Sequence, residues 1–248
     1  MSKISWTERN ALAAAITLYQ KYEGFTVPVE NTNAWVIGIT GVAGVGKSTL
    51  IKPLVKYFRS QDLKVVVLAI DPSSRKDGGA ILGDRERVRD RELDTDKGFF
   101  FRSLATHGEK SALTNALPKI VSYSKLFSDV VIIETAGAGQ TDIEIRDRVD
   151  TLVQVVAPLG DALNLAKAGQ NEYTDIFTVN GRESFRDNKK FFAAASMVLC
   201  QESREGGWTK KVFLVNAKEN KGIDELITDG LLAHREFLKH KPTAKLDT

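Results

Sequence analysis

The chain has 248 residues, enough for one well-buried α/β domain with short extensions but few for two full domains. Its composition is 42% hydrophobic and 27% charged, as in ordinary globular proteins, and no stretch reaches the ~20 apolar residues of a membrane span. We therefore expect no membrane partner, and the net charge of +3 from 35 basic and 32 acidic residues, without basic blocks, argues against nucleic acid as a partner.

The N-terminal residues and the cysteine content predict a cellular location. Residues 1–8 have neither a long apolar core nor a small-residue cleavage site, so we expect no secretory signal. Cys200 is the only cysteine, which excludes an internal disulfide and argues against a cysteine-rich metal site. Both features predict a cytoplasmic protein.

The hydrophobic pattern predicts alternating helices and strands. Residues 4–22 carry Leu12, Ile16, Leu18 and Tyr19, typical of an amphipathic helix on the outside of a domain. Unbroken Val, Ile, Leu and Phe blocks predict strands buried on both faces of a parallel sheet, at 34–39, 64–70, 99–102, 130–133, 152–156, 176–179 and 212–215. Helices are predicted at 47–59, 111–127, 184–202 and 223–239. This order predicts a doubly wound, mostly parallel α/β sheet with helices on both faces.

A glycine-rich motif joins the first predicted strand to the following helix. Three glycines let the backbone wrap round a phosphate, the lysine reaches the β and γ phosphates, and the serine hydroxyl binds Mg²⁺. The nine residues of the motif are Gly41, Val42, Ala43, Gly44, Val45, Gly46, Lys47, Ser48 and Thr49. The spacing of these residues, and the strand before and helix after them, match the pattern of a phosphate-binding loop. The sequence therefore predicts a P-loop nucleoside triphosphatase, with ligands at the carboxyl ends of the strands.

Three acidic residues lie in predicted loops, where they could approach the same metal ion. Asp71 and Glu134 directly follow strands, and Asp84 follows a glycine-bounded loop. Mg²⁺ needs only one or two carboxylates besides the serine and the phosphates, so not all three need be ligands. A turn residue before proline remains an alternative role for Asp71, and a helix cap for Asp84.

The residues after Glu134 predict a sensor of the γ-phosphate. Gly137 has no side chain to obstruct a hydrogen bond from its N–H to that phosphate, and a loop held by one phosphate is released on hydrolysis. Gln140 could orient the attacking water, although a surface glutamine is an equal alternative.

Four blocks together resemble the MeaB/ArgK/MMAA family, GTPase chaperones of adenosylcobalamin-dependent acyl-CoA mutases such as methylmalonyl-CoA mutase. The matching blocks are residues 38–49, 68–74, 78–84 and 133–140. The resemblance implies that Asp71, Asp84 and Glu134 surround the magnesium and the hydrolytic water. It also implies GTP and GDP as ligands, and a third switch at 160–167 that communicates with the mutase. The predicted division is 1–33 as N-terminal helix and linker, 34–240 as P-loop GTPase domain and 241–248 as tail.

The base-reading residues depart from the family pattern. Most GTPases read guanine with Asn-Lys-x-Asp after a strand, whereas this chain has Asn180, Gly181, Arg182 and Glu183. Glu183 can supply the carboxylate, but the lysine that lies along the base is missing. A second loop, Asn216, Ala217 and Lys218, is similar to the Ser-Ala-Lys loop whose backbone touches the base oxygen. We therefore expect guanine in preference to adenine.

In the family the chain continues into a C-terminal helical arm that builds the homodimer, whereas residues 241–248 of this chain look like a loose tail. A homodimer stays possible, but we do not expect the usual arm to build it. Two alternatives to the GTPase chaperone remain open at this point. A nickel-inserting GTPase would need a Cys/His cluster, and the histidines at 107, 234 and 240 are scattered in sequence. An ATP-dependent small-molecule kinase is permitted by the altered base-reading motif.

Overall fold

The computed structural model describes residues 6–22, 33–71, 93, 95–105, 110–135, 145–158, 172–181, 185–200 and 207–240. The chain divides into two compact units, Met1–Val149 and Asp150–Thr248, and each is described by itself. The first unit contains α1 (Trp6–Lys21), β1 (Trp35–Thr40), α2 (Lys47–Ser60), β2 (Val65–Asp71), β3 (Phe99–Ala105), α5 (Lys110–Lys125), β4 (Val130–Glu134) and η1 (Arg146–Arg148).

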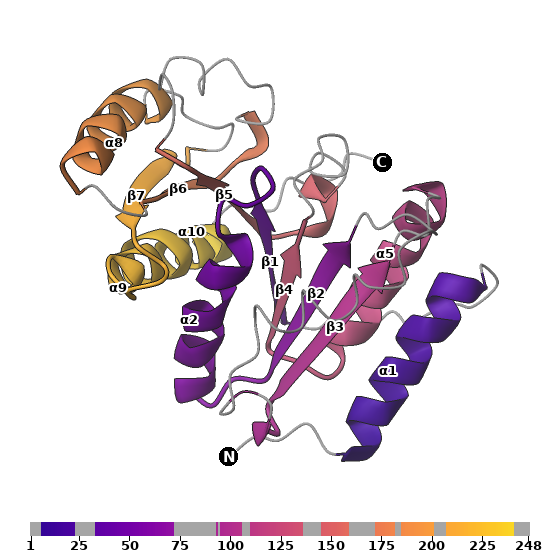
Figure 1. Ribbon diagram of the computed structural model, residues 1–248. Helices are drawn as coiled ribbons and strands as arrows, with labels where there is room; N and C mark the ends of the chain where they lie inside the picture. The colour runs from indigo at the N-terminus through magenta and orange to yellow at the C-terminus, as the bar shows by residue number, and fades with distance from the viewer. Residues whose placement is uncertain are drawn as a thin grey trace. The chain divides into compact units, whose positions relative to one another are not determined.

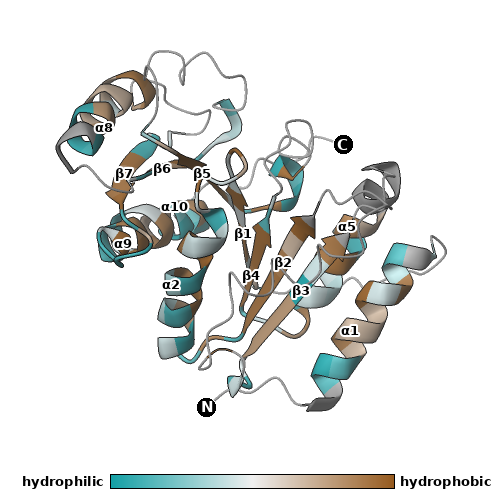
Figure 2. Ribbon diagram, viewed as in Figure 1, coloured by the Kyte–Doolittle hydropathy of each residue, from teal (hydrophilic) through white to brown (hydrophobic). Residues whose placement is uncertain are grey.

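The strands of the first unit are parallel and follow the order β3-β2-β4-β1 (Figure 1). All six residues of β1 are buried, as are the first four of β4, and Figure 2 shows hydrophobic colouring along β2 and β4. Figure 1 shows α2 on one side of these strands and α5 with α1 on the other. Burial on both faces explains the unbroken apolar blocks, and it confirms the predicted α/β fold class.

Helix α2 runs from the glycine-rich motif, at one end of the strands, toward their other end. Its buried residues Leu50, Ile51, Leu54, Val55 and Phe58 recur at helical spacing, so one stripe faces the strands. The Phe58 ring meets Trp35 of β1 edge to face, with ring centroids 5.8 Å apart. This packing fixes where the first turn of α2 lies relative to the end of β1.

Helix α1 packs against α5, as expected for a helix on the outside of the sheet. The Tyr19 and Tyr123 rings meet edge to face at 5.9 Å, and Leu12 and Ile16 are fully buried. Leu18 remains exposed and does not join that apolar face.

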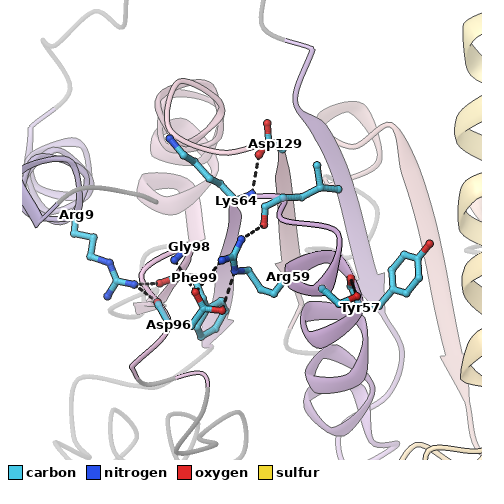
Figure 3. A network of polar contacts seen from close by, with 10 residues as sticks. Arg9, Tyr57, Arg59, Lys64, Asp96, Gly98, Phe99 and Asp129 are labelled. Atoms are coloured by element: carbon cyan, nitrogen blue, oxygen red, sulfur yellow. Dashed lines mark hydrogen bonds and ion pairs between the residues drawn. The ribbon is translucent and has the colours of Figure 1, made fainter. Parts of the chain in front are cut away.

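An ion pair ties the C-terminal end of α2 to the start of β3 (Figure 3). Arg59 donates from Nε to Oδ2 of Asp96 at 2.9 Å and from Nη2 to Oδ1 at 3.0 Å, and its Nη1 donates to the Leu63 carbonyl at 2.6 Å. The Gly98 N–H donates to Asp96 Oδ1 at 2.7 Å, and Arg9 of α1 donates to the carbonyls of Asp96 and Phe99. The two side chains of the ion pair are only 10% and 24% exposed, so water screens it weakly.

The surroundings of Asp96 set its pKa. Burial alone would raise the pKa of this carboxyl, but the hydrogen bonds from Arg59 and Gly98 and the charges of Arg59 and Arg9 outweigh burial. The pKa therefore lies below its ordinary value of 3.8. A carboxyl with a lowered folded-state pKa stabilises the fold above its unfolded-state pKa, and this contribution is lost as the pH falls through the lower value.

Asp96→Asn should lower the free energy of unfolding by about 1–3 kcal/mol near neutral pH, because Arg59 loses its charged partner. The difference from the wild type should shrink as the pH falls through about 4 and below, since the wild-type carboxyl then becomes protonated. Urea denaturation over a pH series measures both effects. Asp62→Asn, at an exposed position after the same helix, is the matched control and should change the stability by no more than about 0.5 kcal/mol. A difference that grows in acid would contradict this account.

The second unit contains β5 (Thr151–Val156), β6 (Ile176–Asn180), α8 (Phe185–Leu199), β7 (Lys211–Val215), α9 (Ile223–Glu225), η3 (Leu226–Leu232) and α10 (Ala233–His240). Its strands are parallel in the order β5-β6-β7. Phe177 and Val179 of β6 pack with Ala195 and Leu199 of α8 in the core. The helix predicted at 223–239 is present, but its middle segment, η3, is a π-helix.

A buried polar cluster attaches α10 to the strands of the second unit. His234 Nδ1 lies 2.9 Å from Thr151 Oγ1, and its Nε2 lies 3.5 Å from the Asp175 carboxylate. Asp175 accepts from the Leu152 N–H at 2.8 Å, and its carbonyl accepts from Trp208 Nε1 at 3.0 Å. Because buried polar groups are costly unless they are paired, these contacts fix the register of α10.

Candidate nucleotide site

The glycine-rich motif of the first unit forms a turn that needs its glycines. Gly41, Gly44 and Gly46 have φ angles of 136°, 76° and 99°, a region that side chains disfavour. The Val45 N–H donates to the Val42 carbonyl at 3.3 Å, which closes the turn before α2 begins. A Cβ at Gly44 would meet nothing within 4 Å, so this part of the loop faces open space. The turn is therefore shaped to hold a ligand at the amino end of α2.

Lys47 is held across this turn. Its side chain is buried, with 6% exposed, and Nζ donates to the Gly41 carbonyl at 2.7 Å and to the Val42 carbonyl at 3.1 Å. A buried ammonium is tolerated only where hydrogen bonds compensate for the lost water. The two carbonyls orient the charge toward the loop, where an anion would neutralise it.

Ser48 and Glu134 meet although 86 residues separate them in the chain. Ser48 Oγ donates to Glu134 Oε1 at 2.6 Å. Glu134 ends β4, whose register places it opposite Ile39 of β1 and Ala69 of β2. The sheet thus brings two oxygen atoms that could bind a metal ion, from a hydroxyl and a carboxylate, to the first turn of α2. Oxygen ligands of this kind suit Mg²⁺.

Two threonines that the sequence reasoning missed hold the strand ends beside this pair. The Thr135 N–H donates to the Ile39 carbonyl at 3.0 Å, and its hydroxyl lies 3.3 Å from that of Thr40, both side chains being buried. They fix the end of β4, and therefore Glu134, against β1. Their positions directly before the glycine-rich motif and directly after Glu134 were the available signal.

The other predicted residues of the phosphate and metal site are only partly described. Asp71 ends β2 and lies opposite Ala105 of β3, so its backbone is at the expected edge of the sheet, but its side chain is outside the described atoms. Thr49 lies exposed in the first turn of α2. The remaining predicted residues, Asp84, Gly137 and Gln140, lie outside the described residues, as do 160–167. Their roles stay predictions.

The second unit holds the predicted base-reading loops. Asn180, at the end of β6, is 5% exposed, and its Oδ1 accepts from the Ala217 N–H at 3.1 Å. Asn216 Oδ1 accepts from the Glu219 N–H at 3.1 Å, which shapes the turn that carries the exposed Lys218. The structure therefore places Asn180 against the turn that contains Asn216 and Ala217, whereas Glu183 lies outside the described residues. That these residues read a base stays a prediction.

The described part of the chain has neither a metal-binding cluster nor a membrane-spanning helix. These residues include no group of three or more His, Cys, Asp or Glu side chains arranged to hold a metal ion. Their helices include none that is long and apolar enough to span a bilayer.

The chain is similar in sequence and in fold to known proteins. The family model described as "Methylmalonyl Co-A mutase-associated GTPase MeaB" matches residues 26–246. A Pyrococcus abyssi protein that carries a GTPase name is 39% identical over 249 residues, which covers 96% of this chain and 76% of that protein. A protein of Cupriavidus metallidurans named fused isobutyryl-CoA mutase is 38% identical over 185 residues, or 70% of this chain and 17% of that one. The crystal structure titled "LAO/AO transport system kinase" superposes with a TM-score of 0.72 at 24% identity, over 94% of this chain and 72% of that one.

Proposed function

The chain belongs to the methylmalonyl Co-A mutase-associated GTPase MeaB family, and from this we propose that it binds and hydrolyses GTP as the chaperone of an adenosylcobalamin-dependent acyl-CoA mutase. Its nucleotide state would control the loading or protection of the cofactor of that mutase. The resemblance recognised in the sequence is thereby confirmed at the level of the family.

The observation that carries the proposal is the way Lys47 is held by the carbonyls of Gly41 and Val42. These contacts keep a positive charge at the amino end of α2, beside a turn whose glycines allow close approach of a ligand. A triphosphate tail fits that combination of charge, backbone N–H groups and helix dipole. Hydrolysis of a phosphoric anhydride requires mainly positioning and charge neutralisation, which such a loop supplies.

The pair Ser48 and Glu134 supports a role for Mg²⁺ next to the phosphates. When bound, this ion would neutralise the charge that develops on the phosphate oxygens. Ser48 would turn its hydroxyl from Glu134 to the ion, and Glu134 would then accept a hydrogen bond from water. We propose that Asp71, Asp84 and Gln140 complete this arrangement, in accordance with their positions after the predicted strands.

The base is proposed to be guanine. The Asn180 carboxamide and the Ala217 amide support each other in the second unit, as base-reading loops require. Glu183 would accept hydrogen bonds from the N1–H and the amino group of guanine, which adenine does not offer. A site built around such hydrogen bonds rejects the analogue that lacks them, often by orders of magnitude.

The mutase is proposed as the partner because a relative that contains a segment similar to this chain carries the name of a mutase. The Cupriavidus metallidurans protein is named fused isobutyryl-CoA mutase and contains a segment similar to this chain. A segment fused to its partner in one protein is a reasonable guide to association between separate chains. The two alternatives, a nickel-inserting GTPase and an ATP-dependent kinase, have no comparable support.

GTP should be hydrolysed faster than ATP, and an adenosylcobalamin-dependent acyl-CoA mutase should co-purify with the protein. Steady-state phosphate release with each nucleotide, with and without added mutase, measures the preference and any acceleration by the partner. Equal rates, or a preference for ATP, would remove the case for Glu183 as the guanine-reading residue. Transfer of phosphate to an acceptor other than water would instead favour the kinase.

A further inference from the structure

The carboxamide of Asn188 lies directly against the backbone of Gly181. A Cβ at Gly181 would be 2.2 Å from Asn188 Nδ2 and 2.6 Å from its Cγ, distances that atoms of real side chains do not reach. Gly181 follows Asn180 at the end of β6, and its N–H donates to the Val215 carbonyl at 2.9 Å. A side chain at position 181 would therefore fit only if the carboxamide of Asn188, the end of a flexible side chain, moved away.

Position 181 is where the common guanine-reading motif carries its lysine. In this chain the loop has glycine there, and the space next to the backbone is taken by a side chain from α8. Asn188 is half-buried, and its carboxamide has no hydrogen-bond partner among the residues that the structure describes. The carboxamide has two N–H donors and an accepting oxygen, with which it could bond a ligand that reached this side of the loop.

Asn180 is engaged differently. Its Oδ1 already accepts from the Ala217 N–H, and the side chain is buried, so Asn180 acts by positioning the two loops. Asn188 carries the same functional group without such an internal bond. A carboxamide can donate to a carbonyl oxygen such as O6 of guanine and accept from a ring N–H or an amino group.

We propose that Asn188 is a specificity-determining residue of the base site, where its carboxamide takes the place of the missing lysine and contacts the guanine. This inference rests on the proposed function, because it presupposes that a guanine nucleotide binds to this loop. It accounts for glycine at position 181, because a side chain there would displace the amide of Asn188 from the place where it lies in this structure. Gly181 and Asn188 then act together in base recognition, because the amide of Asn188 lies where a side chain at position 181 would be.

The test is the affinity of Asn188→Ala for fluorescent GDP and ADP analogues and for inorganic tripolyphosphate. We expect GDP to bind about three- to tenfold more weakly, as for the loss of one hydrogen bond, with tripolyphosphate unchanged. Lys190→Ala, at an exposed position on the same helix, is the matched control and should leave all three affinities unchanged. Asn188→Asp is the second test, for the case that the alanine variant fails to fold. It keeps the size of the side chain but replaces its donor, and it should also weaken GDP binding.

A double variant tests the shared space. Gly181→Lys alone should lower both the melting temperature and the affinity for GDP, because the new side chain collides with the amide. Adding Asn188→Ala should restore both toward the level of Asn188→Ala alone, a non-additive result. Folded Asn188 variants with an unchanged ratio of GDP to ADP affinity, or additive effects in the double variant, would overturn the role of Asn188 alone. Wild-type protein that binds tripolyphosphate but not GDP would overturn the guanine proposal, and this inference with it.

Discussion

Lys47→Ala is expected to weaken GTP binding by about a hundredfold or more, because two phosphate groups lose a charged hydrogen-bond donor. The wild-type ammonium is already held across the turn by the Gly41 and Val42 carbonyls, at 2.7 Å and 3.1 Å. Little conformational entropy is therefore lost when the triphosphate binds, and alanine removes both the charge and its orientation. Isothermal titration calorimetry with a non-hydrolysable GTP analogue and Mg²⁺ measures the change directly.

A control variant shows whether the loss of any lysine charge on α2 weakens binding, or only the loss of the charge at position 47. Lys56→Ala removes an exposed lysine from the same helix and should leave the affinity within about twofold, since screened surface charges contribute little. Thermal denaturation of both variants establishes that they are folded. Unchanged affinity in folded Lys47→Ala would contradict the placement of the triphosphate at this loop.

Glu134→Gln should reduce the rate of GTP hydrolysis by about a hundredfold or more while GTP still binds, because water loses the carboxylate that would accept its proton. Glutamine has nearly the same shape, and its Oε1 can still accept from Ser48, which donates to Glu134 at 2.6 Å in the wild type. The local fold should thus survive. Single-turnover phosphate release at saturating GTP and Mg²⁺ isolates the hydrolytic step from nucleotide exchange.

A magnesium titration distinguishes two ways in which Glu134 could act. If the carboxylate chiefly holds the ion, excess Mg²⁺ should recover much of the lost rate, whereas a role toward water leaves the rate low at every concentration. Glu225→Gln, an exposed change on α9, is the control and should hydrolyse GTP at the wild-type rate. A wild-type rate in folded Glu134→Gln would exclude the residue from the hydrolytic site.

The strands could be predicted from the sequence because parallel strands buried on both faces leave unbroken apolar blocks. β1 was expected at 34–39 and is Trp35–Thr40, and β4 was expected at 130–133 and is Val130–Glu134. Helix α8 ends at Leu199, three residues before the predicted end at 202. Apolar periodicity locates an element well, but its ends depend on local hydrogen bonds that periodicity does not report.

The candidate site was predictable where its chemistry is local. Gly41 to Ser48 form one turn, so the spacing of the residues contains the geometry, and the positive φ angles of the three glycines follow from that spacing. The contact between Ser48 and Glu134 could be anticipated only as a meeting of strand ends, since the order of strands in the sheet decides which loops are neighbours. Arg59 and Asp96 gave no comparable signal, because no motif relates the end of a helix to a turn 37 residues later.

The sequence by itself determined the family, the α/β class and the phosphate-binding turn, because these depend on hydrophobic pattern and on residues adjacent in the chain. Only the tertiary structure decided that Thr40 and Thr135 hold the end of β4, that His234 is buried between Thr151 and Asp175, and that Asn188 rests on Gly181. Each of these contacts depends on the rotation of a helix or the register of a strand. Packing of the whole core sets those two quantities, and no short stretch of sequence contains them.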